Sequence, residues 1–408
     1  MSAASRARKA ALVTGRTAVA LVAVATLVFS GYFWTALRLV KQNTNTTQIL
    51  EVLEDIPNSP PVEDGAVDIL LVGSDSRTDA QGRPLPADVL RKLRTESTDG
   101  VNTDTIIVLR VPRNGGKASA ISIPRDTYVP IAGYREDKIN SAYGAVKYLT
   151  AQRLQAEGVS DQAERERKSD EAGRKALVQA VQDLTGMRVD HYAEINLYGF
   201  YLLTEVIGGV RVCLKAGTSD PNSGANFRAG EQVVSGGDAL SFVRQRNMPG
   251  GDLGRIARQQ VFMSQAVKQL LSAGTFTDPA RMNGLLNAVS KSVVVDQKLD
   301  LATLATQAQG LASGNVEFAT IPVTNIDARN ERGQSVVTVD RDAVKAWVRQ
   351  LIGETLTPVP PSTSATPSGT PSGSTTPSTP ARFGGGKLLS LDGVRAVAAQ
   401  QPSVPCVD

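Results

Sequence analysis

The chain has 408 residues, 41% of them hydrophobic, so it is long enough for one large domain or two small ones with ordinary cores. Its 44 basic and 40 acidic side chains give a formal net charge of +4, too balanced a charge for a general nucleic-acid-binding protein. A single histidine excludes a histidine-rich zinc site. Any function of the basic side chains must therefore depend on where they cluster rather than on the net charge of the chain.

The N-terminal region contains a candidate membrane anchor. Residues 17–37 are uncharged and rich in Ala, Val, Leu and Phe, and their number suits a membrane-spanning helix. The segment before them is basic and has no acidic residue, which predicts a cytoplasmic N-terminus with the rest of the chain outside. A cleaved signal peptide is the alternative, but the run is long for one and is followed by a poor small-residue cleavage site.

These features divide the chain into six segments. We predict a cytoplasmic basic N-terminus (1–16), a transmembrane anchor (17–40), a juxtamembrane stalk (41–66), an extracytoplasmic domain (67–355), a Pro/Ser/Thr/Gly-rich disordered linker (356–387) and a C-terminal tail (388–408). The protein is thus expected to be a single-pass type II protein of the cell membrane.

Within the domain, strand and helix patterns alternate. Strands are predicted at 67–72, 105–111, 118–123, 191–197 and 210–214, and helices at 149–184, 198–206 and from 253 onward. The alternation favours a layered α/β domain.

The only two cysteines are Cys213 in the domain and Cys406 in the tail. In the oxidising environment outside the membrane we expect them to pair, which would tie the tail back to the domain. The alternative is two unrelated cysteines, one of them buried in a strand.

The most distinctive segment is 244–260, which reads Arg-Gln-Arg-Asn-Met-Pro-Gly-Gly-Asp-Leu-Gly-Arg-Ile-Ala-Arg-Gln-Gln. It gathers four arginines around a glycine-rich turn: Arg244, Arg246, Arg255 and Arg258. Guanidinium groups this close repel one another, and their geometry matches phosphate oxygens. The cluster therefore predicts a site for a phosphate or pyrophosphate group.

The helix expected after Asp252 strengthens this prediction. Arg255, Arg258 and Gln259 are spaced i, i+3 and i+4, so they share one face close to a helix N-terminus, which already favours anions. The alternative is a solvated basic face with Asp252 as a plain N-cap. A solvated face usually interleaves acidic residues, and residues 253–268 contain none.

Strand order brings more charged residues to one rim. Asp75 and Arg77 follow the first strand, Asp104 precedes the second, and Arg125 and Asp126 follow the third. If the three strands are antiparallel neighbours, all five lie at the same edge of the sheet. Paired carboxylates there suit Mg²⁺, which takes carboxylate oxygens and fills its shell with water and phosphate. Separately, Asp75 could be a turn cap and Asp104 a strand-edge partner of an arginine.

Three further polar residues are less informative. His191 stands beside Tyr192 at a strand start, and without a Gly-x-Ser-x-Gly motif it is assigned no role. Lys138 and Asn140 follow the third strand closely enough to reach the rim, or else serve only the loop.

Several separated motifs, in this order, resemble the LytR–CpsA–Psr family. They are Asp68-Ile-Leu-Leu-Val-Gly-Ser-Asp-Ser-Arg77, Thr103-Asp-Thr105, Ser122-Ile-Pro-Arg-Asp126, Lys138-Ile-Asn140, Gly230-Glu-Gln232, Val243-Arg-Gln-Arg246 and Gly251-Asp-Leu-Gly-Arg-Ile-Ala-Arg-Gln-Gln260. The resemblance spans about residues 67–270 together with the anchor. It implies an αβα-layered domain with a mixed central sheet, preceded by one transmembrane helix.

The resemblance also implies an activity. Members of this family are membrane-anchored phosphotransferases of the EC 2.7.8 type. They move a glycopolymer from a polyprenyl-pyrophosphate carrier onto a peptidoglycan hydroxyl, or a surface glycoprotein, forming a phosphodiester and releasing polyprenyl phosphate. An apolar groove for the lipid is expected near Phe200, Leu202, Val206 and Ile207, although ordinary core packing explains these residues equally well.

By position, Asp75 and Asp104 resemble the family's Mg²⁺ ligands, with Mn²⁺ as an alternative ion. The residues that resemble its pyrophosphate contacts are Arg77, Arg125, Arg244, Arg246, Arg255, Arg258 and Gln259. Asp252 matches a residue proposed to activate the acceptor hydroxyl, and Arg125 and Arg255 would act beside it.

Two other functions remain open at this point. A polyprenyl-pyrophosphate hydrolase would use the same groups with water in place of a sugar hydroxyl. A non-enzymatic receptor for anionic lipid or glycan would need the arginines but neither Asp75 nor Asp104.

Overall fold

The computed structural model describes residues 45–47, 65–79, 83–96, 101–114, 116–245, 251–270, 278–296, 298–299, 316–352 and 404–407. The predicted anchor (17–40) and linker (356–387), and most of the stalk (41–66) and tail (388–408), lie outside these residues. Among the residues described, no helix combines the length and the apolar character needed to cross a bilayer.

A seven-stranded sheet forms the centre of the molecule, in the order β1-β12-β7-β2-β3-β4-β13. Its strands are β1 (Asn45–Thr47), β2 (Ala66–Ser74), β3 (Thr103–Pro112), β4 (Ala118–Ser122), β7 (His191–Ile195), β12 (Val293–Asp296) and β13 (Val316–Thr320). β3 runs antiparallel to both of its neighbours, β2 and β4, whereas β7 lies parallel to β2 and β13 parallel to β4. The mixed central sheet is therefore confirmed.

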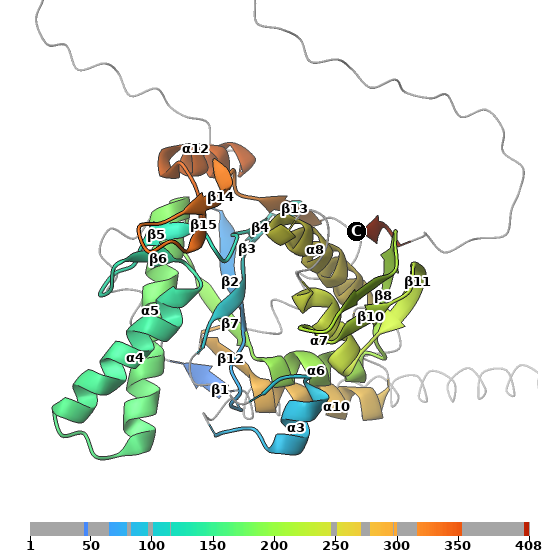
Figure 1. The fold of residues 1–408 in the computed structure, drawn as a ribbon, viewed down its shortest axis with the longest axis horizontal. Helices are drawn as coiled ribbons and strands as arrows, with labels where there is room; N and C mark the ends of the chain where they lie inside the picture. The colour runs from blue at the N-terminus through green and yellow to red at the C-terminus, as the bar shows by residue number, and fades with distance from the viewer. Residues whose placement is uncertain are drawn as a thin grey trace, which may run out of the picture.

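Helices cover both faces of this sheet, and the pleat of β2 and β3 shows why. Alternate side chains point to opposite faces. Leu70 and Val108 join the core that includes α5 (Gln162–Thr185), whereas Leu71 and Ile107 lie on the side of α8 (Gly251–Leu270). Figure 1 shows α4 (Ser141–Ala156) and α5 on one side of the sheet and α8 on the other. The predicted αβα layering is confirmed.

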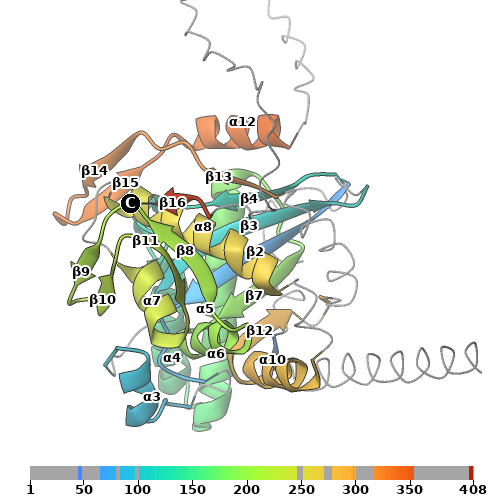
Figure 2. The same ribbon diagram turned by 90° about the vertical axis from the view of Figure 1, so that its right-hand side faces the viewer.

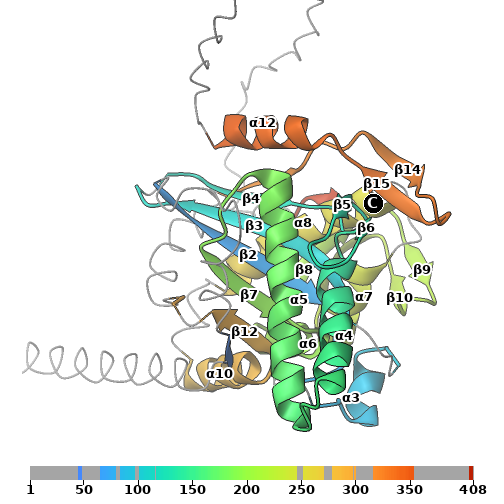
Figure 3. The ribbon, with the colours of Figure 1, turned by 90° about the vertical axis from the view of Figure 1, so that its left-hand side faces the viewer.

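The first helical layer differs from its prediction. One helix was expected over 149–184, but the structure has two, α4 and α5, which pack side by side as a hairpin (Figure 3). The break has a local cause, because Gly158 takes a left-handed conformation and Asp161 caps α5 by accepting hydrogen bonds from the backbone of Ala163 and Glu164.

The α8 side carries a second, smaller core. α8 packs against α7 (Gly236–Arg244), α6 (Leu197–Val206) and a three-stranded sheet of order β11-β8-β16, as Figure 2 shows. The sheet consists of β8 (Val210–Leu214), β11 (Gly230–Val234) and β16 (Cys406–Val407). Phe242 and Phe262 lie at the centre of this core, so the position of α8 depends on apolar packing as well as on its polar face.

Short elements complete the described fold. They are α3 (Ala87–Lys92), β5 (Tyr128–Pro130), β6 (Glu136–Lys138), β9 (Thr218–Asp220), β10 (Ala225–Phe227), α10 (Pro279–Ser292), β14 (Asn325–Arg329), β15 (Ser335–Thr338) and α12 (Arg341–Leu351). β1 lies inside the segment predicted as a stalk, where it pairs with β12 at the sheet edge. Its three polar residues carry no periodic signal, so this strand was not predicted.

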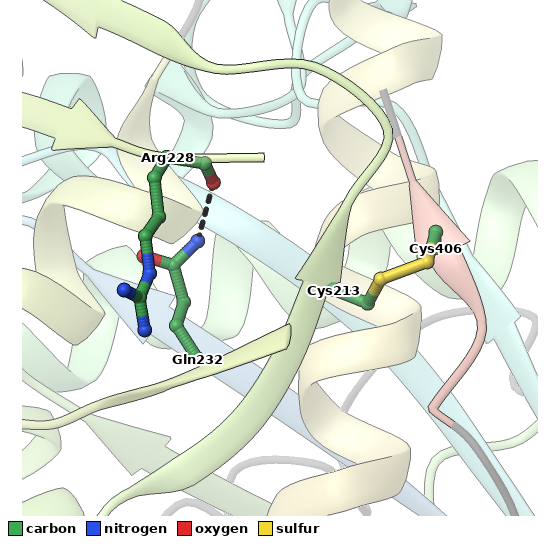
Figure 4. Close-up of a disulfide and its surroundings, with 4 residues drawn as sticks. All are labelled: Cys213, Arg228, Gln232 and Cys406. Carbon is green, nitrogen blue, oxygen red and sulfur yellow. Dashed lines mark hydrogen bonds between the residues drawn. A yellow bond between two sulfur atoms is a disulfide. The ribbon is translucent and has the colours of Figure 1, made fainter. Parts of the chain in front are cut away.

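The disulfide expected between Cys213 and Cys406 is present (Figure 4). β16 runs parallel to β8 with the two cysteines in register, and the backbone amide of Lys215 donates to Val407 at 2.8 Å. Val404 is buried beside them. The tail residues are thus held by a covalent bond, strand pairing and apolar contact together.

Removing this disulfide is expected to destabilise the folded chain. The two cysteines are 193 residues apart, and opening a loop of that length should lower the free energy of unfolding by roughly 2–5 kcal/mol. The measurement is guanidinium unfolding of the full chain followed by circular dichroism, with and without reductant. The double variant Cys213→Ala/Cys406→Ala should unfold at a lower guanidinium concentration than the oxidised wild type, and reductant should not change its midpoint. A fully reduced wild type with an unchanged midpoint would contradict the prediction.

Candidate active site

A cavity of about 680 Å³ opens between the central sheet and the α8 side of the molecule. This volume falls in the range of small-molecule sites. Its polar lining includes Asp75 and Asp104 from the sheet, Asn196 before α6, Arg244 at the end of α7, and Arg255 and Gln259 from α8. The structure thus brings together residues that lie more than 180 positions apart in the sequence.

Strand pairing places the two carboxylates at one rim, as predicted. β2 ends where β3 begins, so Asp75 follows one strand while Asp104 lies at the start of the other. The backbone amide of Asp75 donates to the carbonyl of Asn102 at 2.9 Å, and the amide of Asn102 donates to Asp75 Oδ1 at 2.6 Å. These reciprocal bonds fix the carboxylate of Asp75 against the start of β3.

Arg77 and Arg125 contact these carboxylates rather than lining the cavity. Arg77 Nη1 lies 2.6 Å from the carbonyl oxygen of Asp75 and 3.1 Å from its Oδ2. Arg125 Nη1 donates to Asp104 Oδ1 at 2.6 Å. Each arginine therefore orients one carboxylate and offsets its charge.

The loop after β4 supports Arg125. Asp126 lies 3.5 Å from Arg125 Nε and accepts from Lys138 Nζ at 2.9 Å. The backbone amide of Asn140 donates to the carbonyl of Arg125 at 3.1 Å, and its own carbonyl accepts from Thr103 at 3.2 Å. Lys138 and Asn140 thus reach the rim indirectly, as supports for Arg125 and for the start of β3.

The carboxylate pair suits a metal ion whose other ligands are not protein side chains. In the described part of the chain, no three or more His, Cys, Asp or Glu side chains gather into a metal-binding group. Asp104 Oδ2 accepts no hydrogen bond from the described residues, whereas Oδ1 is held by Arg125. Two carboxylates with available lone pairs match Mg²⁺, which fills its remaining positions with water and substrate phosphate.

Three of the predicted anion contacts line the cavity together. Arg244 lies at the cavity wall with its Nη1 3.1 Å from the carbonyl oxygen of Leu93. Arg255 is 3% exposed, and Gln259, one turn further along α8, donates to the carbonyl of Val243 at 3.1 Å. Arg246 lies outside the described residues, and Asp252 is described only as part of the first turn of α8. Their predicted roles stay predictions.

Arg258 points elsewhere. It is 1% exposed, does not line the cavity, and donates to Gln245 Oε1 at 3.3 Å and to the Gln245 carbonyl at 2.9 Å. Gln245 in turn donates to Thr218 Oγ1. Burial, together with the neighbouring Arg255, lowers the pKa of Arg258 to about 10. Its geometry is that of a positioning residue that holds Gln245, the residue that follows α7.

An apolar groove adjoins the main cavity. A second cavity of about 120 Å³ shares Ile107 and Met263 with the first and runs between the sheet and the later turns of α8. Val267 and Phe318 are among its lining residues. Polar and apolar side chains therefore line the cavity near the start of α8, whereas the groove near its end is mainly apolar.

Of the residues expected near a lipid groove, only Phe200 lines the main cavity, where it stacks on Phe262 with ring centroids 5.3 Å apart. Ile207 belongs to the core beneath the three-stranded sheet. Leu202 and Val206 do not line either part of the described site.

The lone histidine lies away from this cavity. His191 begins β7, whereas Ile195, which lines the cavity, ends it. His191 Nδ1 is 3.1 Å from Asp296 Oδ2, a carboxylate that also accepts from the backbone of Tyr192. The structure thus gives His191 a local partner and no place in the site.

Sequence reasoning missed one part of the lining, the turn between β9 and β10. Asp220, Asn222 and Ser223 all face the main cavity. The string Asp-Pro-Asn-Ser-Gly is a strong turn signal, but a turn signal does not show which surface the turn meets.

Comparison with known proteins shows clear relatives. The LytR_cpsA_psr family matches residues 36–352. The cell wall biosynthesis protein LcpA of Corynebacterium glutamicum is 48% identical over 340 residues, covering 83% of this chain and 65% of its own length. The polyisoprenyl-teichoic acid–peptidoglycan teichoic acid transferase TagU of Oceanobacillus iheyensis is 31% identical over 250 residues, covering 61% and 64%. This chain thus spans about two thirds of each relative.

A solved structure shares the fold. Protein gbs0355 of Streptococcus agalactiae superposes with a TM-score of 0.52 at 20% identity, covering 76% of this chain and 91% of that one.

Replacing Arg255 should affect ligand binding, whereas replacing Arg258 should affect the stability of the fold. Arg255→Met is expected to weaken binding of inorganic pyrophosphate by roughly tenfold to a hundredfold, because a charge-assisted contact is lost. Arg258→Met should instead lower the free energy of unfolding by about 1–3 kcal/mol, because both of its bonds to buried Gln245 are lost.

The measurements are isothermal titration calorimetry with Mg²⁺ pyrophosphate and thermal unfolding of the full chain. Arg258→Lys is the conservative control and should recover part of the stability. If Arg258→Met kept its melting temperature and lost pyrophosphate binding, the positioning role of Arg258 would be wrong.

Proposed function

Since the chain belongs to the LytR–CpsA–Psr family, we propose that it is a membrane-anchored phosphotransferase. It moves a glycopolymer from a polyprenyl-pyrophosphate carrier onto a hydroxyl of peptidoglycan, or of a surface glycoprotein, outside the cytoplasm. The observation that carries this proposal is an arginine-bearing cavity, lined by both polar and apolar side chains, that lies next to an apolar groove. A substrate with an anionic group between an apolar chain and a glycan fits an arginine-bearing cavity next to an apolar groove.

Each part of such a donor has a counterpart in the site. The pyrophosphate would lie among Arg244, Arg255 and Gln259, because guanidinium and amide donors match phosphate oxygens. The prenyl chain would leave along the groove between the sheet and α8, past Met263 and Val267. The predicted anchor at 17–40 would keep the domain near the membrane in which the carrier lies.

The proposed reaction is a phosphoryl transfer. The oxygen of the acceptor hydroxyl attacks the phosphorus nearest the glycan, and the new P–O bond forms as the bond to the bridging oxygen breaks. That oxygen leaves with the electron pair as part of polyprenyl phosphate. The hydroxyl proton passes to a base, a role for which the family resemblance suggests Asp252. Such a reaction depends mainly on positioning and charge, which this site is equipped to supply.

The chain's own residues divide this work. Arg244, Arg255 and Gln259 orient the pyrophosphate and stabilise charge on the leaving phosphate. Arg77 and Arg125 hold Asp75 and Asp104 in place as ligands for Mg²⁺ or Mn²⁺. When bound, the ion would neutralise pyrophosphate charge. Arg258 holds Gln245, the residue after Arg244, and so acts as a positioning residue.

Asp104→Asn is expected to lower the transfer rate by at least roughly a hundredfold, because the loss of one carboxylate charge weakens the metal site. The assay uses the full chain in detergent with a short-chain prenyl-pyrophosphoryl glycan and peptidoglycan, over a Mg²⁺ titration. Attached glycan is measured after washing.

Asp327→Asn is the matched control, because Asp327 is an exposed aspartate on β14 that does not line the cavity. It should keep the wild-type rate. Release of glycan phosphate without attachment would favour a hydrolase. Donor binding without turnover, unchanged in Asp104→Asn, would contradict the metal-assisted mechanism and favour a receptor.

A further inference from the structure

The turn between β9 and β10 forms part of the wall of the main cavity, and no step of the proposed reaction uses it. Asp220, Asn222 and Ser223 contribute to the cavity wall. Asp220 and Ser223 are only 3% and 4% exposed, whereas Asn222 is exposed. The cavity therefore has a wall segment whose chemistry differs from that of the arginines.

The turn is held rigidly by its own side chains. Asp220 Oδ1 accepts from the backbone amide of Asn222 at 3.1 Å, and Oδ2 accepts from Ser223 Oγ at 2.9 Å. Arg94 Nη1 donates to the carbonyl of Gly224 at 2.7 Å. Gly224 has φ +70°, and a Cβ there would lie 2.8 Å from Arg94 Cδ, so this end of the turn requires glycine. The side chain of Asn222 is thus presented from a preorganised backbone.

The same hairpin is tied to the arginine segment. Thr218 in β9 accepts from Gln245, the residue after Arg244, and Gln245 is held by Arg258 of α8. The carboxylate of Asp220 also lies close enough to Arg258 to favour its charged form. The turn therefore keeps a fixed position relative to the first turns of α8.

The turn and the apolar groove lie near different ends of α8. The distance along the helix axis from Arg255 to Val267 is about 18 Å, from a rise of about 1.5 Å per residue. The apolar groove lies at the Val267 end, and the turn is tied to the end that holds Arg255 and Arg258. With the prenyl chain in the groove and the pyrophosphate at Arg255, the sugar end of the donor lies beside the turn.

The chemistry of the turn favours a sugar over a phosphate. It carries no cation, and the carboxylate of Asp220 repels anions. The side-chain amide of Asn222 makes no hydrogen bond with the described residues, and it offers both donors and an acceptor at the cavity wall. Sugar hydroxyls also both donate and accept, so a neutral amide complements them.

We propose that residues 220–223 form the subsite for the sugar ring attached to the pyrophosphate, with Asn222 as its hydrogen-bonding contact. This inference rests on the proposed function, because it assigns one wall of the same site to one part of the proposed donor. Asn222 then distinguishes the glycan-bearing carrier from a bare prenyl pyrophosphate. It is a specificity-determining residue, not a residue of the phosphoryl-transfer step.

The test compares two ligands on the full chain in detergent with Mg²⁺. One is geranylgeranyl pyrophosphate, and the other is geranylgeranyl pyrophosphate bearing N-acetylglucosamine on its terminal phosphate. Asn222→Ala should weaken binding of the sugar-bearing ligand by roughly threefold to tenfold, the effect of one hydrogen bond. It should leave the affinity for the sugarless ligand unchanged.

Asn226→Ala is the matched control, because Asn226 is an exposed asparagine on the same hairpin that does not line the cavity. It should bind both ligands as the wild type does. Equal losses for both ligands in Asn222→Ala, or no loss for the sugar-bearing one, would overturn the sugar subsite while leaving the proposed function standing. A wild type that bound neither ligand would overturn the proposed function and the subsite with it.

Discussion

The pairing of β2 with its two neighbours is the constraint on which the rest of the site depends. β3 runs antiparallel to β2 and β7 runs parallel to it, so the end of β2, the start of β3 and the end of β7 meet at one edge. That edge carries Asp75, Asp104 and Asn196, and the first turn of α6 begins there as well. A shift of one residue in the β2–β3 register would send Asp104 to the opposite face of the sheet, because successive side chains alternate.

A second constraint comes from α8, which brings two arginines into a poorly solvated position. Arg255 and Arg258 are both buried, and their mutual repulsion adds to the desolvation that lowers the pKa of Arg258. Arg258 is stabilised by Gln245, whereas Arg255 faces a cavity large enough for an anion. If Arg255 binds the pyrophosphate as proposed, stability and binding are divided between two neighbouring positions on one helix.

The sequence allowed the carboxylate rim to be predicted, because three short antiparallel strands leave few ways to arrange their ends. It offered an arginine partner for Asp104 only as an alternative, which Arg125 confirms, and it did not show that Arg77 would contact Asp75, since hydrogen-bond partners depend on side-chain conformation. The prediction that Arg255, Arg258 and Gln259 share one face was also too coarse, because only Arg255 and Gln259 line the cavity. Successive helix residues differ by about 100° in direction, and the boundary of the cavity falls between Arg258 and Gln259. The β9–β10 turn was missed because its place at the cavity follows from tertiary packing alone.

The bond between Cys213 and Cys406 makes the polypeptide between them a closed covalent ring. α8, with Arg255 and Gln259, lies inside this ring, as do α12 and the strands β12 and β13. A single backbone cut between the two cysteines, wherever it falls, therefore leaves both pieces in one molecule. Proteolytic nicking of the oxidised protein would change its topology from ring to branched chain without releasing the helix that lines the cavity.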